Sequence, residues 1–318
     1  MSQQQLVSVL IPVYNAGEYL NDAVLSIVNQ THENIEIIIV DDGSTDGCID
    51  SIRDLTDSRI RLLSQKNGGK SVALNHALEK VAGDFFLIQD ADDISYPQRI
   101  EVMLDCLLNN ETLAAVFSGH DLLLGKKRFA PTFKSIDERG CQQLIDQLSM
   151  PAHDPTGMYR LSALSGMRFD DTLRIGQGVD FVLRVGEKCP MVRLGDCLYS
   201  YRINYSSTIR RDANKTNASV NVVREKACVR RSLDFDQFKV DFKPRAVKGR
   251  YLDADIIPHC MESVIDLKRQ GCFFDACIVG WQCAKLHPLG PYFYKPFVYV
   301  VTPVRIINLF RRIKACWF

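Results

Sequence analysis

Three aspartates follow an apolar run in this chain: Phe85–Ile88 leads through Gln89 to Asp90, Asp92 and Asp93. Carboxylates a few ångströms apart repel each other, so each makes its neighbours harder to ionise. A divalent cation would remove that cost, and oxygen ligands suit Mg²⁺ or Mn²⁺. The alternative for these residues is a solvated turn that caps the next helix. The rest of the N-terminal half favours the metal.

The composition is that of an ordinary globular protein. The chain has 318 residues, of which 46% are hydrophobic and 24% are charged. This length allows one large domain, or a domain with an appendage. The formal net charge of +1 provides no overall field that would attract nucleic acid, so we expect no nucleic-acid partner.

The cysteines and the N-terminal residues indicate a compartment. Eleven cysteines are scattered without a CxxC pair, which favours a reducing environment. The first residues lack the charged and apolar regions of a signal peptide. No uninterrupted apolar run reaches the roughly 20 residues that a membrane-spanning helix needs. The sequence therefore predicts a cytoplasmic protein.

Strand-like and helix-like segments alternate over the first 120 residues. Helical patterns begin at Glu18 and cover Ser71–Val81 and Pro97–Leu108. The expected strands are Val7–Val13, Ile35–Val40, Ile60–Leu63, Phe85–Ile88 and Leu113–Ser118. This alternation predicts an α/β fold with a doubly wound, mostly parallel sheet.

Polar clusters stand where four of these strands end: Tyr14-Asn15, Asp41-Asp42, Asn67–Lys70 and Asp90–Asp93. Ligands of doubly wound sheets bind outside the carboxyl ends of the strands, so these clusters should line one crevice. No GxGxxG follows the first strand, and the segment around Lys70 lacks the first glycine of a phosphate-binding P-loop. Dinucleotide and P-loop nucleotide binding are therefore disfavoured.

The segments VSVLIPVYNAG, IEIIIVDDGSTDG, NGGKSVALNHAL and GDFFLIQDADD resemble the nucleotide-sugar-binding half of family 2 glycosyltransferases, which have the GT-A fold. The likeness is dense over residues 6–120 and continues weakly to about residue 210. It implies a nucleotide-sugar-binding half over residues 1–120 and an acceptor-binding half over residues 121–210. Residues 211–318 would form a helical extension.

The resemblance implies a role for each polar cluster. Pro12, Tyr14 and Asn15 correspond to the nucleobase pocket, where Tyr14 would stack on the ring. Asp42 corresponds to the acid that accepts a hydrogen bond from the base, which suits the imide of uracil.

The loop and helix that approach the ribose and phosphates correspond to Asn67, Gly68, Lys70 and Asn75. The bare backbone of Gly68 would allow close contact, and the start of the helix favours anions.

The Asp90-Ala91-Asp92 segment corresponds to the DxD motif of the family. By this likeness Asp90 faces the ribose, Asp92 binds the metal that bridges the diphosphate, and Asp93 assists through water.

The general base of the family stands in a Glu-Asp or Gln-Asp pair at a helix start. Aligning on Arg184 places Gln177 first in the pair and Gly178 where the base usually stands. Asp180 follows two residues later. We expect the glycines around 176–178 to extend the loop, so that the helix begins at Asp180 and its carboxylate faces the crevice as the base. The alternative is that Asp180 only caps this helix.

Two later segments are also similar to the family. Met150–Arg160 resembles the strand that floors the acceptor site, with His153 and Thr156 as candidate sugar contacts. In the segment after the last strand, Arg202 is a candidate for the diphosphate, or packs on neighbouring tyrosines. The usual histidine is Asn204 here, which implies weaker metal binding.

The C-terminal third is predicted to be helical. Leu252–Lys268 and Phe273–Leu286 have the pattern of a helical hairpin. In the tail, an apolar stripe lies opposite a basic face, and its members are Ile306, Leu309, Phe310, Ile313 and Trp317. A basic amphipathic helix of this kind can lie in the interface of an anionic membrane, or else dock on the protein.

Together these features predict a metal-dependent, inverting glycosyltransferase. It would use Mn²⁺ or Mg²⁺ and move a sugar from a UDP-sugar to a glycan or lipid-linked acceptor. The setting would be cell-surface polysaccharide synthesis, in the cytoplasm at the inner face of the membrane. Gly178 and Asn204 leave open a catalytically silent nucleotide-sugar-binding protein, and a nucleotidyltransferase is a third, weaker alternative.

Overall fold

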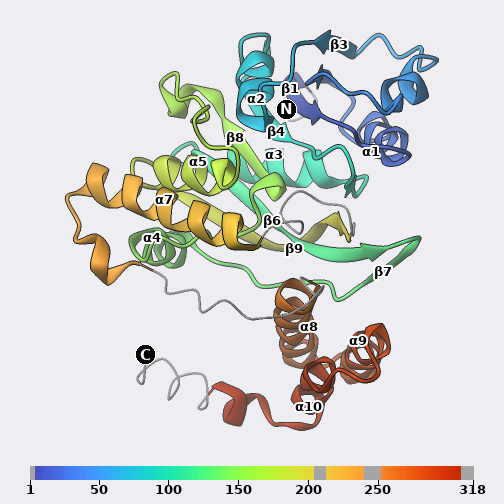
Figure 1. The fold of residues 1–318 in the computed structure, drawn as a ribbon, viewed down its shortest axis with the longest axis vertical. Coiled ribbons are helices and arrows are strands. Elements are labelled where there is room, and N and C mark those ends of the chain that lie inside the picture. Colours follow the sequence, from blue (N-terminus) through green and yellow to red (C-terminus); the bar gives the residue numbers. More distant parts are fainter. Residues whose placement is uncertain (1–3, 204–212, 240–251, 309–318) are drawn as a thin grey trace.

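A computed structural model describes residues 4–203, 213–239 and 252–308 (Figure 1). Nine strands of these residues form one sheet in the order β3-β2-β1-β4-β8-β6-β9-β5, with β7 paired to β6. The expectation of an α/β fold with a mostly parallel sheet and C-terminal helices is confirmed.

The N-terminal half of the sheet is parallel throughout. Its strands are β1 (Val7–Val13), β2 (Ile35–Asp41), β3 (Ile60–Ser64) and β4 (Phe85–Ile88), and its helices are α1 (Tyr19–Val28), α2 (Lys70–Leu78) and α3 (Arg99–Asn109). Strand β1 pairs with β2 on one side and β4 on the other, and β2 pairs with β3. The carboxyl ends of β1, β2 and β4 therefore meet at one edge, as the polar clusters required.

The second half of the sheet is mixed. It contains β5 (Ile94–Ser95), β6 (Ala115–Leu124), β7 (Lys127–Phe129), β8 (Gly157–Arg160) and β9 (Met191–Arg202), with α4 (Glu138–Asp146) and α5 (Gln177–Gly186). Strand β8 runs antiparallel between β4 and β6, and β6 runs parallel to β9. The fifth expected strand, over residues 113–118, is in fact β6, which extends six residues further.

Alternating strand residues divide the core into two layers. Val9 and Ile11 of β1 pack with α1 and α3 on one face, whereas Leu10 packs with α2 and α5 on the other. Strand residues point to opposite faces in turn, so a strand that is apolar throughout is buried on both. This is why these strands appear in the sequence as continuous apolar runs.

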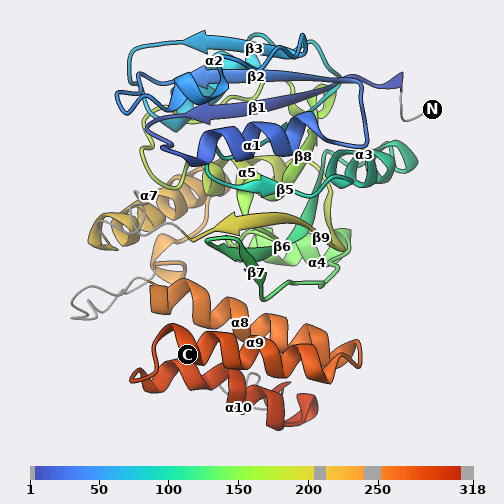
Figure 2. The ribbon, with the colours of Figure 1, turned by 90° about the vertical axis from the view of Figure 1, so that its right-hand side faces the viewer.

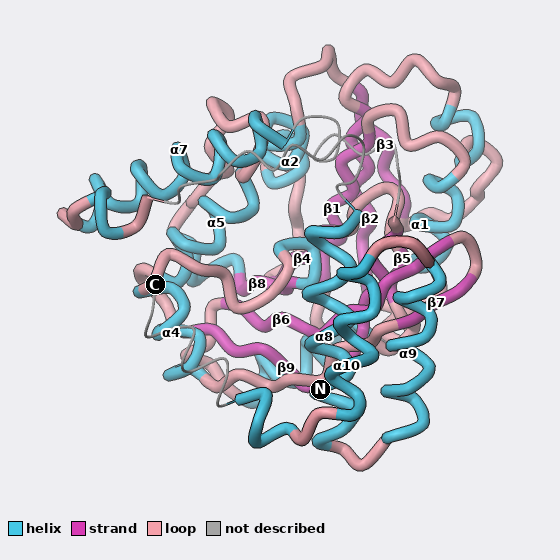
Figure 3. Tube along the Cα trace, turned by 60° about the horizontal axis from the view of Figure 1, so that its bottom comes forward, coloured by secondary structure: helices cyan, strands magenta, loops and turns pink. Residues whose placement is uncertain are grey.

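Helix α7 (Ala213–Arg231) joins the layer of α2 and α5, since Val223 and Ala227 share their core. The next three helices are α8 (Leu252–Arg269), α9 (Phe273–Leu286) and α10 (Lys295–Val301). They form a separate layer beside β6 and β7, with its own apolar core (Figures 2 and 3). The expected hairpin is thus present as α8 and α9. Most of the expected tail helix, from residue 309 onward, lies outside the described residues.

The remaining elements are short 3₁₀ helices at Cys48–Ile52, Asp154–Thr156, Leu161–Leu164, Phe235–Gln237 and Pro291–Tyr294. The ten cysteines in the described part of the chain are free thiols. Among the helices of that part, none is both long and apolar enough to cross a membrane.

Candidate active site

The turn that carries the three aspartates is held by a buried polar framework. The side-chain amide of Gln89 donates to the carbonyls of Asp90 (3.0 Å) and Asp93 (2.9 Å). The fully buried guanidinium of Arg99 donates to the side chain of Gln89 (3.2 Å) and to the carbonyl of Pro155. Buried hydrogen bonds of this kind hold the groups that they join in a defined geometry. The turn is therefore rigidly connected to the segment before β8.

Asp90 and Asp92 are the two carboxylates of this turn that remain partly accessible. Asp90 accepts a hydrogen bond from Lys70 Nζ at 2.6 Å. Burial, together with the negative charge of Asp90, raises the pKa of the Asp92 carboxyl to about 6. Such a raised pKa marks a carboxylate whose charge is poorly compensated within the protein.

Asp93 is enclosed rather than free to assist a metal. One of its oxygens accepts from the Tyr199 hydroxyl (2.8 Å) and the other from the Arg202 backbone N–H (2.7 Å), and its side chain is 1% exposed. Burial and the charges of Asp92 and Asp90 raise its pKa well above the ordinary value. We therefore correct the expectation for Asp93: it fixes the turn to β9.

Arg202 also supports this turn. Its Nε donates to the carbonyl of Asp92 at 2.6 Å, and its guanidinium lies over the ring of Tyr19, 4.5 Å from the centroid. A further nitrogen lies 3.5 Å from Asp22. Of the two roles expected for Arg202, the structure thus shows packing on an aromatic ring, although the ring belongs to α1. Asn204, at the position where the family has a histidine, lies outside the described residues.

Lys70 is the first residue of α2, and its ammonium lies near both the aspartate turn and the segment before β8. Its ammonium is 2.6 Å from Asp90 and 3.9 Å from Asp154, which lies in the Met150–Arg160 segment but was not among the predicted site residues. Burial alone would lower the pKa of Lys70, but the carboxylates of Asp90 and Asp154 outweigh it and raise that pKa. Lys70 therefore stays cationic beside the helix start.

Asp42 anchors the loop that leads into α2. Its oxygens accept from the side chain of Gln65 (2.8 Å) and from the N–H groups of Gly68 and Gly69 (2.7 Å each). Its side chain is buried, and these hydrogen bonds hold the loop in place. The lack of a side chain at Gly68 has a packing reason as well, since a Cβ there would lie 2.9 Å from Val72.

Tyr14 and Asn15 stand at the end of β1. Tyr14 is 54% exposed, although it directly follows a buried strand. Asn15 donates its N–H to Ser44 Oγ (3.1 Å) and accepts from the Thr45 N–H (2.8 Å), so it joins the loops after β1 and β2. Pro12 is half-buried in β1, and Asn67 is exposed in the loop before α2.

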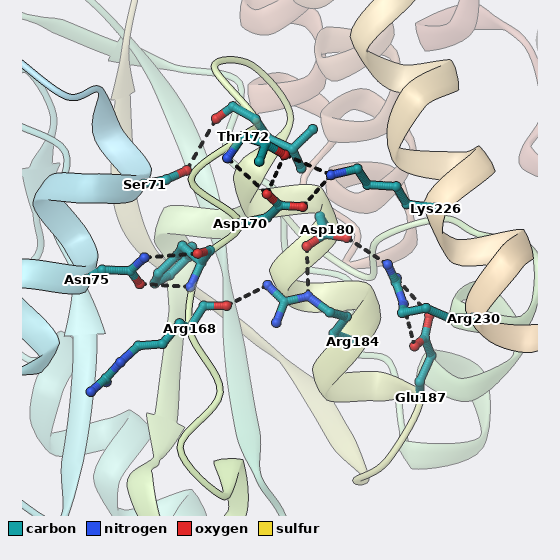
Figure 4. Close-up of polar contacts among 12 residues, drawn as sticks. Ser71, Asn75, Arg168, Asp170, Thr172, Asp180, Arg184, Glu187, Lys226 and Arg230 are labelled. Carbon is teal, nitrogen blue, oxygen red and sulfur yellow. Dashed lines mark hydrogen bonds and ion pairs between the residues drawn. The ribbon is translucent and has the colours of Figure 1, made fainter.

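Asn75 does not approach the crevice. Its amide both donates to the Phe169 carbonyl (2.9 Å) and accepts from the Phe169 N–H (2.8 Å) (Figure 4). This reciprocal pair ties α2 to the loop before α5. The expected contact of Asn75 with ribose or phosphate is thus replaced by a structural role.

The expected placement of Asp180 is wrong. Helix α5 begins at Gln177 with Gly176 as its N-cap, so Asp180 lies inside the helix. Its side chain is 1% exposed, and its two oxygens accept from Arg184 (2.7 Å) and Arg230 of α7 (3.0 Å) (Figure 4). The capping alternative fails as well, because Asp180 is not at the cap. Both oxygens face cations, so we do not retain Asp180 as the base.

On the acceptor side, Thr156 is also a structural residue. It is fully buried, and its hydroxyl donates to the carbonyl of His153 at 2.6 Å. His153 remains partly accessible, and its ring packs against His120 and Tyr201. Of the two acceptor candidates, only His153 stays near accessible space.

Two charged residues of the site were not predicted from the sequence. A Cβ at Gly69 would lie 2.6 Å from Nη1 of Arg174, so this exposed arginine lies against the loop before α2. A Cβ at Gly178 would lie 2.1 Å from Oδ2 of Asp154, so that carboxylate occupies the space of the missing side chain. Each residue is distant in sequence from the glycine that it contacts, and neither of them was singled out from the sequence.

The carboxylates of the turn can supply only part of the ligands that a divalent cation needs. In the described part of the chain, no group of three or more His, Cys, Asp or Glu side chains is arranged to hold a metal ion. Mg²⁺ and similar ions are, however, commonly bound by one or two carboxylates together with substrate phosphates. The raised pKa of Asp92 beside Asp90 is consistent with such a shared site.

Comparisons with known proteins agree with this geometry. A family model described as glycosyl transferase family 2 matches residues 8–166, half of the chain. The protein therefore belongs to glycosyl transferase family 2.

Two curated relatives illustrate the extent of the match. An uncharacterized glycosyltransferase of Haemophilus influenzae is 37% identical over 137 residues, covering 42% of this chain and 55% of the relative. Glycosyltransferase GlyG of Streptococcus pneumoniae serotype 4 is 29% identical over 263 residues, covering 75% and 85%. The chain thus spans only about half the length of some curated relatives that it matches.

Solved glycosyltransferases share the fold. S. aureus TarS 1-349 in complex with UDP-GlcNAc superposes with a TM-score of 0.57 and 16% identity, over 93% of this chain and 88% of that one. The mannosyltransferase PcManGT of Pyrobaculum calidifontis, in complex with GDP-Man and Mn²⁺, gives 0.53 and 17%, over 95% and 86%. The GT-A fold expected from the sequence is confirmed.

Proposed function

We propose that this chain is a metal-dependent, inverting glycosyltransferase that moves a sugar from a UDP-sugar to a glycan or lipid-linked acceptor. The observation that carries the proposal is the poorly compensated carboxylate of Asp92, beside Asp90 and Lys70, at the edge where β1, β2 and β4 end. Structural neighbours in complex with UDP-GlcNAc, and with GDP-Man and Mn²⁺, support a nucleotide sugar as donor.

The donor would lie along this edge of the sheet. Tyr14 would stack on the base, with Pro12 and Asn15 beside it, and Asp42, directly after β2, would accept from the uracil imide. Asn67 and the loop held by Asp42 would follow the ribose. Lys70 and the start of α2 would favour the diphosphate.

Asp92 and Asp90 would hold Mn²⁺ or Mg²⁺ together with the diphosphate. The ion would supply positive charge where the leaving nucleoside diphosphate becomes more negative. Lys70 would add a fixed cation on the same side, and Arg174 would lie close enough to the loop to reach a phosphate. Preorganised charges of this kind stabilise a transition state without reorganisation.

A screen of nucleotide sugars by thermal unfolding, with and without Mn²⁺, tests the proposal. A ligand that binds only the folded state raises the unfolding temperature. We expect a UDP-sugar to do so more strongly with Mn²⁺ than without it, and to be turned over when p-nitrophenyl glycosides are offered as acceptors. If no nucleotide sugar shifts the unfolding temperature, the proposal is refuted.

Gly178 favours a second candidate, a nucleotide-sugar-binding protein without catalysis. By family likeness the base is missing at this position. Binding of a UDP-sugar without transfer or donor hydrolysis would establish this second function. Measured turnover of the bound donor would exclude it.

We further propose that the chain works at the inner face of an anionic membrane, where it contributes to cell-surface polysaccharide. Phe274, Ile278 and Trp281 are all at least half exposed, and their spacing places them on one face of α9. Lys285 lies over the ring of Trp281, 5.2 Å from its centroid. From residue 276 to 318 the chain has six Lys or Arg and no Asp or Glu. Exposed aromatic rings next to cations suit a surface of anionic lipid.

Sedimentation with vesicles tests this placement. We expect the protein to bind vesicles that contain phosphatidylserine and not pure phosphatidylcholine, and Phe274→Ser with Trp281→Ser to abolish binding. Leu62→Ser is the matched control, since Leu62 is also exposed but lies on β3, far from α9 (Figure 2). Equal binding by the double variant would contradict the proposal.

A further inference from the structure

The carboxylate of Asp154 occupies the place that the missing side chain of Gly178 would fill. An ideal Cβ on Gly178 would lie 2.1 Å from Oδ2, 2.4 Å from Cγ and 2.7 Å from Cβ of Asp154. These distances are far below van der Waals contact, so a side chain at 178 and the present position of Asp154 exclude each other. A glycine at 178 is therefore the condition for this carboxylate to stand at the start of α5.

We propose that Asp154 is the general base of the reaction and that it replaces the base absent at Gly178. The inference rests on the proposed function, since it assigns a residue for sugar transfer. A carboxylate is present in the first turn of α5, but it enters from the neighbouring segment instead of from the helix itself.

The position of Asp154 is fixed by the framework that also holds the aspartate turn. It begins the 3₁₀ helix Asp154–Thr156, in which Pro155 restricts the backbone. The Pro155 carbonyl accepts from Arg99, which also binds Gln89 under the aspartate turn. A base must be held at a defined distance from the reacting atoms, and this framework meets that requirement.

Asp154 also lies close to the aspartate turn. The ammonium of Lys70 lies between it and Asp90, 3.9 Å from one and 2.6 Å from the other. The side chain of Asp154 is 18% exposed, so an acceptor hydroxyl can reach it. Asp180, in contrast, is 1% exposed and faces two guanidinium groups.

The sugar-transfer step needs no reactant beyond the residues and substrates already named. The acceptor oxygen forms a bond to the anomeric carbon while its proton passes to the Asp154 carboxylate. The bond from that carbon to the β-phosphate oxygen breaks, and its electron pair leaves with the UDP. The proton is released from Asp154 to water after the products depart. Attack opposite the leaving group inverts the anomeric carbon.

The first test removes the carboxylate. Turnover of a UDP-sugar, chosen by the thermal screen, is measured with p-nitrophenyl glycosides for the parent protein and for Asp154→Asn. We expect donor affinity to change little and turnover to fall by about 10² to 10⁴, the usual contribution of a general base. Asp171→Asn is the matched control, an exposed aspartate in the loop before α5, and should keep full turnover.

The second test moves the carboxylate to the other position. Gly178→Asp alone should lose turnover and thermal stability, because the new side chain collides with Asp154. Asp154→Gly combined with Gly178→Asp removes the collision and should regain at least tenfold over Asp154→Gly alone. This recovery would show that turnover requires a carboxylate at this place, whichever of the two segments carries it.

The outcomes distinguish a failure of the proposed function from a failure of the assignment of Asp154 as the base. A parent protein that binds the donor and transfers nothing refutes the proposed function. An active parent with an equally active Asp154→Asn refutes only the assignment of the base. A double variant that folds and binds donor but recovers no turnover makes Asp154 a positioning residue and overturns its role as base.

Discussion

The donor end of the sheet and the region around α5 hold their polar residues in different ways. At the donor end, Tyr14, Asp42 and Asp90 stand at or just after the ends of parallel strands, and those strands fix their places. Around α5, carboxylates and cations come from the segment before β8, from α5 and from α7. At the donor end, a sequence motif therefore identifies individual site residues. Near α5, the same role can be filled by a residue of another segment.

The largest change in stability among our predictions is expected on replacing Asp180. Replacing it with Asn removes the anionic partner of Arg184 and one of the two anionic partners of Arg230, which also pairs with Glu187. Breaking a buried ion pair costs about 3 to 5 kcal/mol, so the free energy of unfolding in urea should fall by that order. If the variant unfolds like the parent but has lost transfer, Asp180 is the base after all.

A smaller effect is expected at the donor end. Tyr14→Ala removes the exposed ring that we place on the nucleobase, and stacking of a base on an aromatic side chain contributes about 1 to 3 kcal/mol. UDP affinity, measured by calorimetry, should fall accordingly while the free energy of unfolding stays the same. Tyr14→Phe keeps the ring and should bind like the parent. An unaffected affinity in Tyr14→Ala would remove the tyrosine from the donor site.

The smallest effect concerns the contact between α8 and the acceptor side. Burial lowers the pKa of His259 to about 4, against the opposing effect of its hydrogen bond with the Ala130 carbonyl. In the unfolded chain the ordinary pKa is about 6.5, so the unfolded state takes up the proton first as the pH falls. Stability should therefore fall between about pH 6.5 and 4, by at most about 1.4 kcal/mol per pH unit.

His259→Gln is the variant for this measurement. Glutamine does not titrate, and its amide can still donate to the Ala130 carbonyl. Unfolding followed at several pH values should show a shallower loss of stability in the variant. Desolvation also lowers the pKa of His120, which leaves a residual slope in both proteins. An identical slope in parent and variant would show that His259 is not kept neutral in the fold.

Much of the donor half could be predicted from the sequence. The residues of β1 and β4 were placed correctly because a buried parallel strand is a continuous apolar run with polar residues after it. Helix ends differed by one to three residues, since capping residues allow several starts. The insertion of β8 between β4 and β6 was missed, because the choice of a pairing partner is not a local property.

The site was less predictable where its contacts are distant in sequence. Asp180 resembled a helix start because glycines precede it, but one of the two residues that neutralise it, Arg230, is 50 positions further along the chain. Asn75 and Thr156 carry polar side chains that satisfy nearby backbone groups. Only the folded chain brings Asp154 into the space beside Gly178.

The most direct test of the account is a calorimetric titration of UDP in the presence and absence of Mn²⁺, for the parent and for Asp92→Asn. We expect Mn²⁺ to strengthen UDP binding at least tenfold in the parent and to have no effect in the variant, while both unfold at similar temperatures. The same gain with Mn²⁺ in Asp92→Asn would contradict it, because the cation would then be held elsewhere.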